Sequence, residues 1–258
     1  MLKTGSKAHV LASSQNTPPP CPVEIDADVA RKLINACREG DVDSCHVMLI
    51  KLQMRYPDSV LELKSSFSLV TYQPLFDLIG HGFALAASFN HVLCIEFLLS
   101  SHYASVLRDG VCGDPQRFPP FRTLVRHELA HCVHSIRFVA FAALSCIEHL
   151  AFRGFTFLVE TNVLWDFEAS LCLSFAMRRA VAAACEENPN EAGLVSPLAF
   201  HPMIVLLVKH YDFLVDEVRQ FHKKFLPQQH EGEDITMVKL FERVKALQAS
   251  LLYEIIVG

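Results

Sequence analysis

The residues best placed to do chemistry are the run His127-Glu128-Leu129-Ala130-His131. On an α-helix, side chains four positions apart share a face, so both imidazoles could bind one zinc ion. Glu128 would then act as the general base and take a proton from a zinc-bound water. The spacing therefore admits a hydrolytic zinc site with His127 and His131 as metal ligands and Glu128 as the catalytic residue.

This run resembles the signature of the zincin metalloproteases. The resemblance implies a third ligand, for which the sequence offers Glu148, as in the gluzincin arrangement, or His134. Two observations favour a structural helix instead. Histidine is frequent, with 13 among 258 residues, so a chance match to this short pattern is more common than usual. No strand is predicted upstream to border an active-site cleft. We therefore predict no catalytic residue, metal or cofactor here, and keep a zinc-dependent metallopeptidase-like protein as the alternative.

The nine cysteines are interpreted as buried, reduced thiols. No Cys-x-x-Cys pair occurs, which argues against a structural zinc ribbon or finger. Six of them lie on predicted apolar helix faces: Cys37, Cys45, Cys94, Cys146, Cys172 and Cys185.

Other polar and aromatic residues are given structural interpretations. We expect Trp165 to lie in the core, and Glu96 and Glu148 to be solvated. The His-Tyr pairs at 102–103 and 210–211 are interpreted as helix ends, where a Tyr could also contact a partner.

The clearest structural unit is a pair of short helices at 82–107. Small alanines in its first helix permit close packing against a second helix. Asn90-His91 supplies the break between them, because Asn tolerates the left-handed conformation that ends a helix. A lone pair of this kind cannot bury both faces, so it needs similar neighbours.

The chain supplies similar pairs. Residues 33–52 repeat the plan, with a turn at Gly40-Asp41 and Cys45 placed as the equivalent of Cys94. Residues 145–150 are interpreted as a third copy of the second helix, with Cys146 matching Cys94. A fourth copy is expected at 206–211, its first helix at 182–188.

These residues resemble the ankyrin repeat, whose pattern places Leu-x-x-Ala in a first helix, Gly-His at the turn and Ile-Val-x-x-Leu-Leu in the second helix. The resemblance implies an all-α fold of stacked antiparallel helix pairs, an ankyrin-like solenoid, here with long insertions. It also implies a non-enzymatic scaffold or adaptor that binds another protein through a groove and loops.

The expected organisation has four parts. These are a disordered tail at 1–24, ankyrin-like pairs at 25–110, degenerate pairs at 121–226 and a C-terminal capping helix at 235–258. Within these parts, 67–76 is interpreted as a brief strand or an ordered loop, and Thr161-Asn162 is expected to open a longer helical stretch. The Pro- and Gly-rich stretch at 109–120 is the strongest candidate for a boundary or a functional loop.

Composition narrows the function classes. Apolar residues make up 51% of the chain, which suggests a well-buried stack or an apolar face reserved for a partner, such as a subunit of a larger complex. The net charge of −5, with scattered basic residues, offers no electrostatic footprint for nucleic acid. No segment is apolar enough to span a membrane. We expect an intracellular protein, cytoplasmic first, with mitochondrial or nuclear location left open.

Overall fold

The computed structural model describes residues 22–57, 66–112, 136–185 and 196–218. These residues are mostly helical and form no strand, with an isolated antiparallel bridge between Val111 and Arg137. The predicted all-α class is confirmed for this part of the chain. None of its helices is long and apolar enough to cross a membrane. The helices are α1 (Ala27–Glu39), α2 (Val42–Arg55), α3 (Ser66–Ser88), α4 (Val92–Ser100), α5 (Ala104–Asp109), α7 (Phe138–Glu148), α8 (Phe152–Glu160), α9 (Asp166–Cys185), the 3-10 helix η4 (Pro197–Phe200) and α10 (His201–His210).

Local capping explains where α1 and α2 begin and end. The Asp26 carboxylate accepts a hydrogen bond from the backbone N–H of Asp28 at 2.8 Å, which fixes the start of α1. Gly40 ends α1 in the left-handed conformation, with φ of 74°. Asp41 then caps α2 by accepting from the N–H of Ser44 at 3.0 Å. The turn predicted at Gly40-Asp41 is confirmed.

The same turn follows α1, α3 and α7. Each turn has one residue in the left-handed conformation: Gly40, Asn90 and Leu150. In each, the next N–H closes the turn on a carbonyl five residues earlier: Asp41 to Ala36 at 2.9 Å, His91 to Ala86 at 2.9 Å and Ala151 to Cys146 at 2.8 Å. The predicted left-handed break at Asn90 is confirmed.

These turns correct two sequence matches. Cys146 occupies the position of Ala86, near the end of a first helix, so it is not the counterpart of Cys94 in a second helix. Cys45 corresponds to Ile95, because their N–H groups bond to the equivalent carbonyls of Asp41 and His91. A short run of identical residues does not fix the register between two repeats. The position of the turn fixes it.

Two predicted elements are also wrong. Residues 67–76 form part of α3, with Pro74 inside the helix, and are neither a strand nor a loop. Thr161-Asn162 ends α8 and does not open the next helix, since Asn162 is left-handed and α9 begins at Asp166. Both segments are rich in residues whose local preference is not helical, and tertiary packing decides their conformation.

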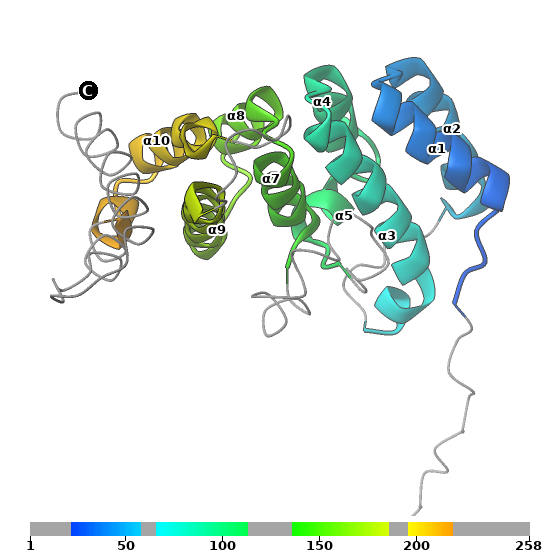
Figure 1. Ribbon diagram of the computed structural model, residues 1–258. Coiled ribbons are helices and arrows are strands. Elements are labelled where there is room, and N and C mark those ends of the chain that lie inside the picture. Colours follow the sequence, from blue (N-terminus) through cyan, green and yellow to red (C-terminus); the bar gives the residue numbers. More distant parts are fainter. Residues whose placement is uncertain (1–21, 58–65, 113–135, 186–195, 219–258) are drawn as a thin grey trace, which may run out of the picture.

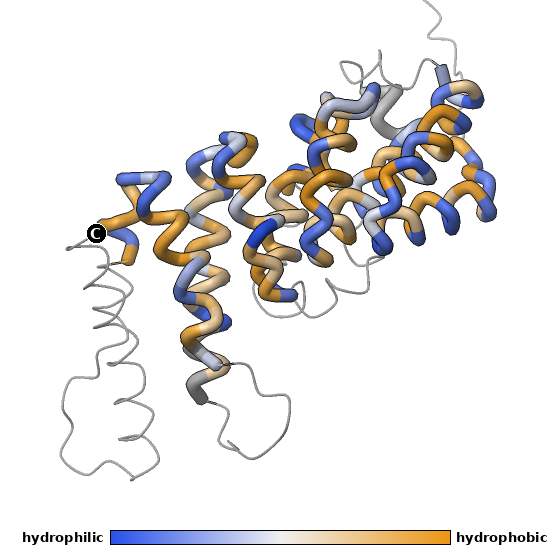
Figure 2. The backbone as a smooth tube through the Cα atoms, turned by 90° about the horizontal axis from the view of Figure 1, so that it is seen from above, coloured by the Kyte–Doolittle hydropathy of each residue, from blue (hydrophilic) through white to orange (hydrophobic). Residues whose placement is uncertain are grey.

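The helix pairs lie side by side along the molecule (Figure 1). In one row, α1 packs against α3, α3 against α7, and α7 against α9. In the other row, α2 contacts α4, α4 contacts α8, and α8 contacts α10. Apolar residues face the space between helices and polar residues cover the outside (Figure 2). One hydrophobic core runs through all four pairs.

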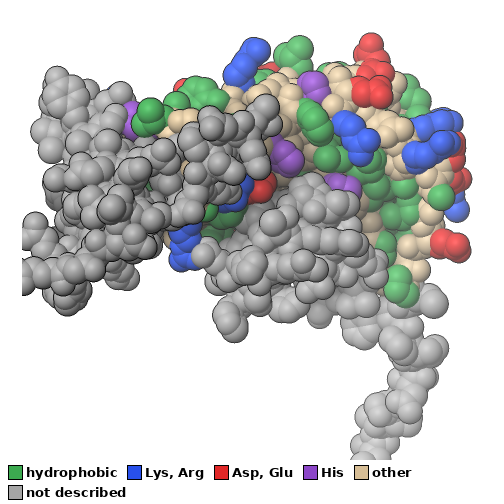
Figure 3. Space-filling model, viewed as in Figure 1, with side chains coloured by type: hydrophobic (Ala, Val, Ile, Leu, Met, Phe, Trp, Pro, Cys, Tyr) green, Lys and Arg blue, Asp and Glu red, His purple; other side chains and the backbone are tan. Residues whose placement is uncertain are grey.

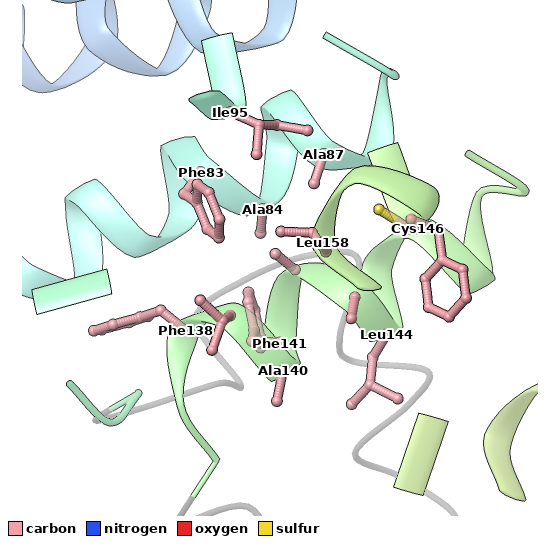
Figure 4. Close-up of a cluster of buried hydrophobic side chains, with 14 of the residues drawn as sticks. Phe83, Ala84, Ala87, Ile95, Phe138, Ala140, Phe141, Leu144, Cys146 and Leu158 are labelled. Carbon is pink, nitrogen blue, oxygen red and sulfur yellow. The ribbon is translucent and has the colours of Figure 1, made fainter. Parts of the chain in front are cut away.

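The α3–α7 contact is the most extensive in the described chain. Phe83 and Ala84 of α3 face Phe138 and Phe141 of α7, with Leu158 of α8 close by (Figure 4). Every residue of α7 from Phe138 to Ile147 is buried. A polar contact also crosses this apolar interface: the Ser88 and Ser145 hydroxyls hydrogen-bond at 2.7 Å.

Residues 110–112 and 136–138 are paired beside α5 and α7. The N–H of Cys112 donates to the carbonyl of Ile136 at 3.0 Å, and the N–H of Phe138 donates to the carbonyl of Gly110 at 3.1 Å. The units predicted at 25–110 and 121–226 therefore share one core where the structure describes them. The predicted C-terminal helix at 235–258 lies outside the described residues, as does all but the end of the tail at 1–24.

Candidate functional site

A pocket of about 520 Å³ lies between the C-terminal ends of α4, α5 and α8 and the loop that leads from α8 to α9. Its rim combines exposed charges with apolar side chains, so it offers both burial and hydrogen bonding to a ligand. The residues lining it are Glu96, Leu99, Ser100, Arg108, Asp109, Arg137, Phe157, Thr161, Asn162, Val163 and Trp165.

Trp165 is the largest exposed side chain at this pocket. Its surface is 53% accessible, and the neighbouring Phe167 is 54% accessible. The two ring centroids are 5.8 Å apart. The prediction that Trp165 lies in the core is wrong, because the residue sits in the loop before α9 rather than on an inward helix face.

Arg137 anchors the loop between α8 and α9. Its guanidinium is buried and pairs with the fully buried carboxylate of Glu168, with Nε 2.8 Å from Oε1 and a second contact from Nη2 to Oε2. The same guanidinium donates to the carbonyl of Arg108 at 2.6 Å and to that of Val163 at 2.9 Å. A buried charge is tolerated only when its hydrogen-bonding capacity is met in this way.

The Arg137–Glu168 pair also fixes the orientation of the indole. The Arg137 guanidinium carbon lies 3.6 Å from the centroid of the Trp165 ring, in cation–π geometry. Glu168 Oε2 accepts a hydrogen bond from the Trp165 backbone N–H at 2.9 Å. Four segments are joined at one point, and an exposed aromatic side chain is held in a single position.

This arrangement is suited to binding. The Arg137 charge is already neutralised by Glu168. A rigid, exposed Trp beside a pocket is the kind of residue that carries binding energy at protein interfaces.

Most of the predicted site residues lie outside the described chain. His127, Glu128, His131 and His134 all fall in 113–135, so the zinc hypothesis stays a prediction. Glu148 is described, at the end of α7, and its Oε2 is 3.1 Å from Nε of Arg179. Glu148 is therefore ion-paired and partly buried rather than solvated as predicted, because α9 packs against α7. Glu96 is exposed, as predicted.

The two His-Tyr pairs differ in their surroundings. Tyr103 is fully buried, so it cannot offer the partner contact considered for it. Tyr211 is partly buried, and its hydroxyl donates to the carbonyl of Leu164 at 3.4 Å. His210 Nε2 lies 2.6 Å from the side-chain oxygen of Asn162, which ties α10 to the end of α8.

Three thiols meet elsewhere, between the first two helix pairs. Cys45 Sγ lies 3.5 Å from Cys37 Sγ and 3.6 Å from Cys94 Sγ. Hydrogen bonds from Cys37 and Cys45 lower the pKa of the Cys94 thiol to about 4. The hydrogen bond with Cys37 lowers the pKa of Cys45, but the bond to Cys94 and burial outweigh it and raise that pKa to about 12. Cys94 is thus the first of the three to ionise.

Sequence reasoning missed Arg137 and Glu168. The available signal was a lone arginine between Ile136 and Phe138 in an otherwise apolar stretch, since a charge placed there must find a buried partner. It also missed the meeting of the three thiols, which come from three helices and show no regular spacing. From the sequence, only Cys45 and Cys94 were related to each other, as equivalent positions in two repeats and not as residues in contact.

On the face seen in Figure 3, acidic and basic side chains intermix over α1 and α2. Asp28, for example, pairs with both Arg31 and Lys32.

Comparison with protein-family models, curated proteins and solved structures found no match to this chain.

Proposed function

We propose that this protein is a non-enzymatic scaffold or adaptor of ankyrin-like architecture, which binds another protein at the pocket beside Trp165. The observation that carries the proposal is the exposed, immobilised Trp165, held by Arg137 and Glu168 at the edge of a pocket of about 520 Å³. A rigid aromatic side chain loses little conformational entropy on binding, so its burial is converted efficiently into affinity.

Three features support the ankyrin-like part of the proposal. Helix pairs pack in two parallel rows, equivalent turns follow the first helices, and a short backbone pairing at 110–112 and 136–138 connects two helix pairs. Repeat proteins of this kind present loops on one side, and those loops form the binding surface. The pocket lies where α4, α5 and α8 end, beside the loop that follows α8.

The proposed partner surface is apolar at its centre and charged at its edge. Trp165 and Phe167 provide the exposed aromatic area, while Glu96, Arg108 and Asp109 provide exposed charges around the pocket. Interfaces are commonly arranged in this way, with aromatic anchors surrounded by a polar rim. We expect a partner segment with a side chain that enters the pocket beside the indole.

The proposal predicts that Trp165→Ala weakens partner binding strongly. The full-length wild-type chain, attached to a support, should capture a protein from its native source, to be identified by mass spectrometry and then purified for titration. Loss of a central aromatic anchor costs about 2 kcal/mol, or roughly a 30-fold rise in Kd. Isothermal titration of the purified partner measures this change.

Met54→Ala is the matched control. Met54 is 79% exposed on α2, a helix that contributes no residue to the pocket lining. Its removal should leave the Kd within about twofold. Equal Kd values for wild type and Trp165→Ala, with both chains folded by circular dichroism, would refute the proposed site.

A further inference from the structure

The three thiols of Cys37, Cys45 and Cys94 form a buried cluster that the binding surface does not use. Cys37 lies near the end of α1, Cys45 in the first turns of α2, and Cys94 in the first turn of α4. All three side chains are fully buried, and their sulfur atoms lie within 4.8 Å of one another. Three donor atoms from three helices therefore converge on one point.

The spacing of the sulfur atoms suits a common metal ion. Metal–thiolate bonds of about 2.3 Å hold three sulfur atoms about 3.8–4.0 Å apart. The observed separations are 3.5 Å for Cys37–Cys45 and 3.6 Å for Cys45–Cys94. Binding an ion would widen these two separations by only a few tenths of an ångström.

The helix positions favour the thiolate form that a metal requires. Cys45 and Cys94 lie near the N-termini of α2 and α4, where the helix dipole stabilises negative charge. Cys37, near the C-terminus of α1, lacks this help, so the metal itself must favour its ionisation.

The donor set discriminates between ions. Soft sulfur ligands select Cu⁺ and Zn²⁺ over hard cations. Structural zinc sites take four ligands in tetrahedral geometry. Among the described residues, no fourth Cys, His, Asp or Glu donor joins the three within 4.8 Å, and full burial leaves no accessible surface for water.

We propose that Cys37, Cys45 and Cys94 form a three-coordinate, all-sulfur site for a cuprous ion. The ion would join α1 and α2 to α4, and so attach the first helix pair to the second. Binding one Cu⁺ releases one proton from each of the three thiols, so the fully ionised site carries a net charge of −2. The step involves no change in the oxidation state of copper or sulfur, provided that copper is supplied as Cu⁺.

The test is an anaerobic titration of the full-length, reduced chain with Cu⁺ against a chromogenic Cu⁺ chelator. Wild type should take one more equivalent of Cu⁺ from the chelator than the Cys37→Ala and Cys94→Ala variants do. Thiolate-to-copper absorption in the near ultraviolet should appear with that equivalent, and X-ray absorption should report sulfur-only ligation.

Cys172→Ala is the matched control, because Cys172 is also fully buried but lies in α9, away from the cluster. It should retain the wild-type stoichiometry. If a cluster variant fails to fold, hydrogen exchange measured on the wild type tests the proposal instead. Cu⁺ should slow amide exchange in α1 and α2 and leave exchange in α9 unchanged.

Three results would overturn the proposal. The first is no Cu⁺ uptake by wild type beyond that of the cluster variants. The second is an equal loss in Cys172→Ala. The third is a parallel titration in which Zn²⁺ alone is held by the same three cysteines and Cu⁺ is not, which would assign the ion as zinc.

Discussion

At the scale of single residues, Arg137 and Glu168 show how two charges can be kept inside an apolar stack. Each is almost wholly buried, and between them they make bonds to Arg108, Val163 and Trp165. Forming such a pair contributes little net stability because desolvation offsets the attraction. Breaking it is costly, since the remaining charge is left buried without a partner.

Arg137→Leu should therefore destabilise the protein by about 3–5 kcal/mol, measured by urea denaturation. Adding Glu168→Leu should recover part of that loss, because the double variant leaves no buried charge.

Arg31→Leu serves as the control for Arg137→Leu. Arg31 pairs with Asp28 at 2.7 Å, but its side chain is 71% exposed, so the change should cost less than about 1 kcal/mol. An equal loss in the free energy of unfolding for the two arginine variants would mean that the buried Arg137 pair matters no more to stability than an exposed ion pair.

At the scale of elements, the close approach of α3 and α7 depends on the absence of a side chain at Gly80. A Cβ built there would lie 2.0 Å from Cδ1 of Phe138. Phe138 is fully buried at the start of α7 and has little room to move aside. The close packing of α3 therefore depends on a glycine outside the predicted pair at 82–107, as well as on the alanines within it.

Gly80→Ala should destabilise the protein by about 1–3 kcal/mol despite the higher helix propensity of Ala. Thermal and urea unfolding measure the effect. The cost should shrink in a Phe138→Leu background, where the clashing ring is gone. Gln53→Ala, on the exposed face of α2, should be nearly neutral. A neutral or stabilising Gly80→Ala would show that α3 and α7 are not held this closely.

At the scale of the whole molecule, burial is greatest in the middle of the stack. Residues 138–147 of α7 are all buried, whereas α1 buries only Leu33, Ala36 and Cys37. In stacked helix pairs each unit is stabilised by its neighbours, so a pair at the end of the described stack has one fewer interface. Stability should therefore fall from α7 toward α1.

Hydrogen exchange followed by mass spectrometry tests this gradient. Amides of 138–148 should exchange most slowly, and those of 27–39 should exchange at least tenfold faster in the metal-free protein, since local opening there exposes less apolar surface. Uniform protection across the two helices would indicate a single cooperative unit, and slower exchange in α1 would contradict the gradient.

The sequence by itself determined the local features of this protein. Asp26, Gly40 and Asn90 set where helices begin and end, because capping and left-handed turns depend on a few neighbouring residues. The helix pairs at 33–52 and 82–107 followed from apolar spacing between those breaks.

Only the tertiary structure decided which residues meet. Residues 67–76 are helical because α1 and α7 pack along α3. The Arg137–Glu168 pair, the exposed Trp165 and the three-thiol cluster each join residues from different helices or loops. Such contacts depend on how the helices stack. The spacing of two residues along the chain does not reveal how far apart they lie in the fold.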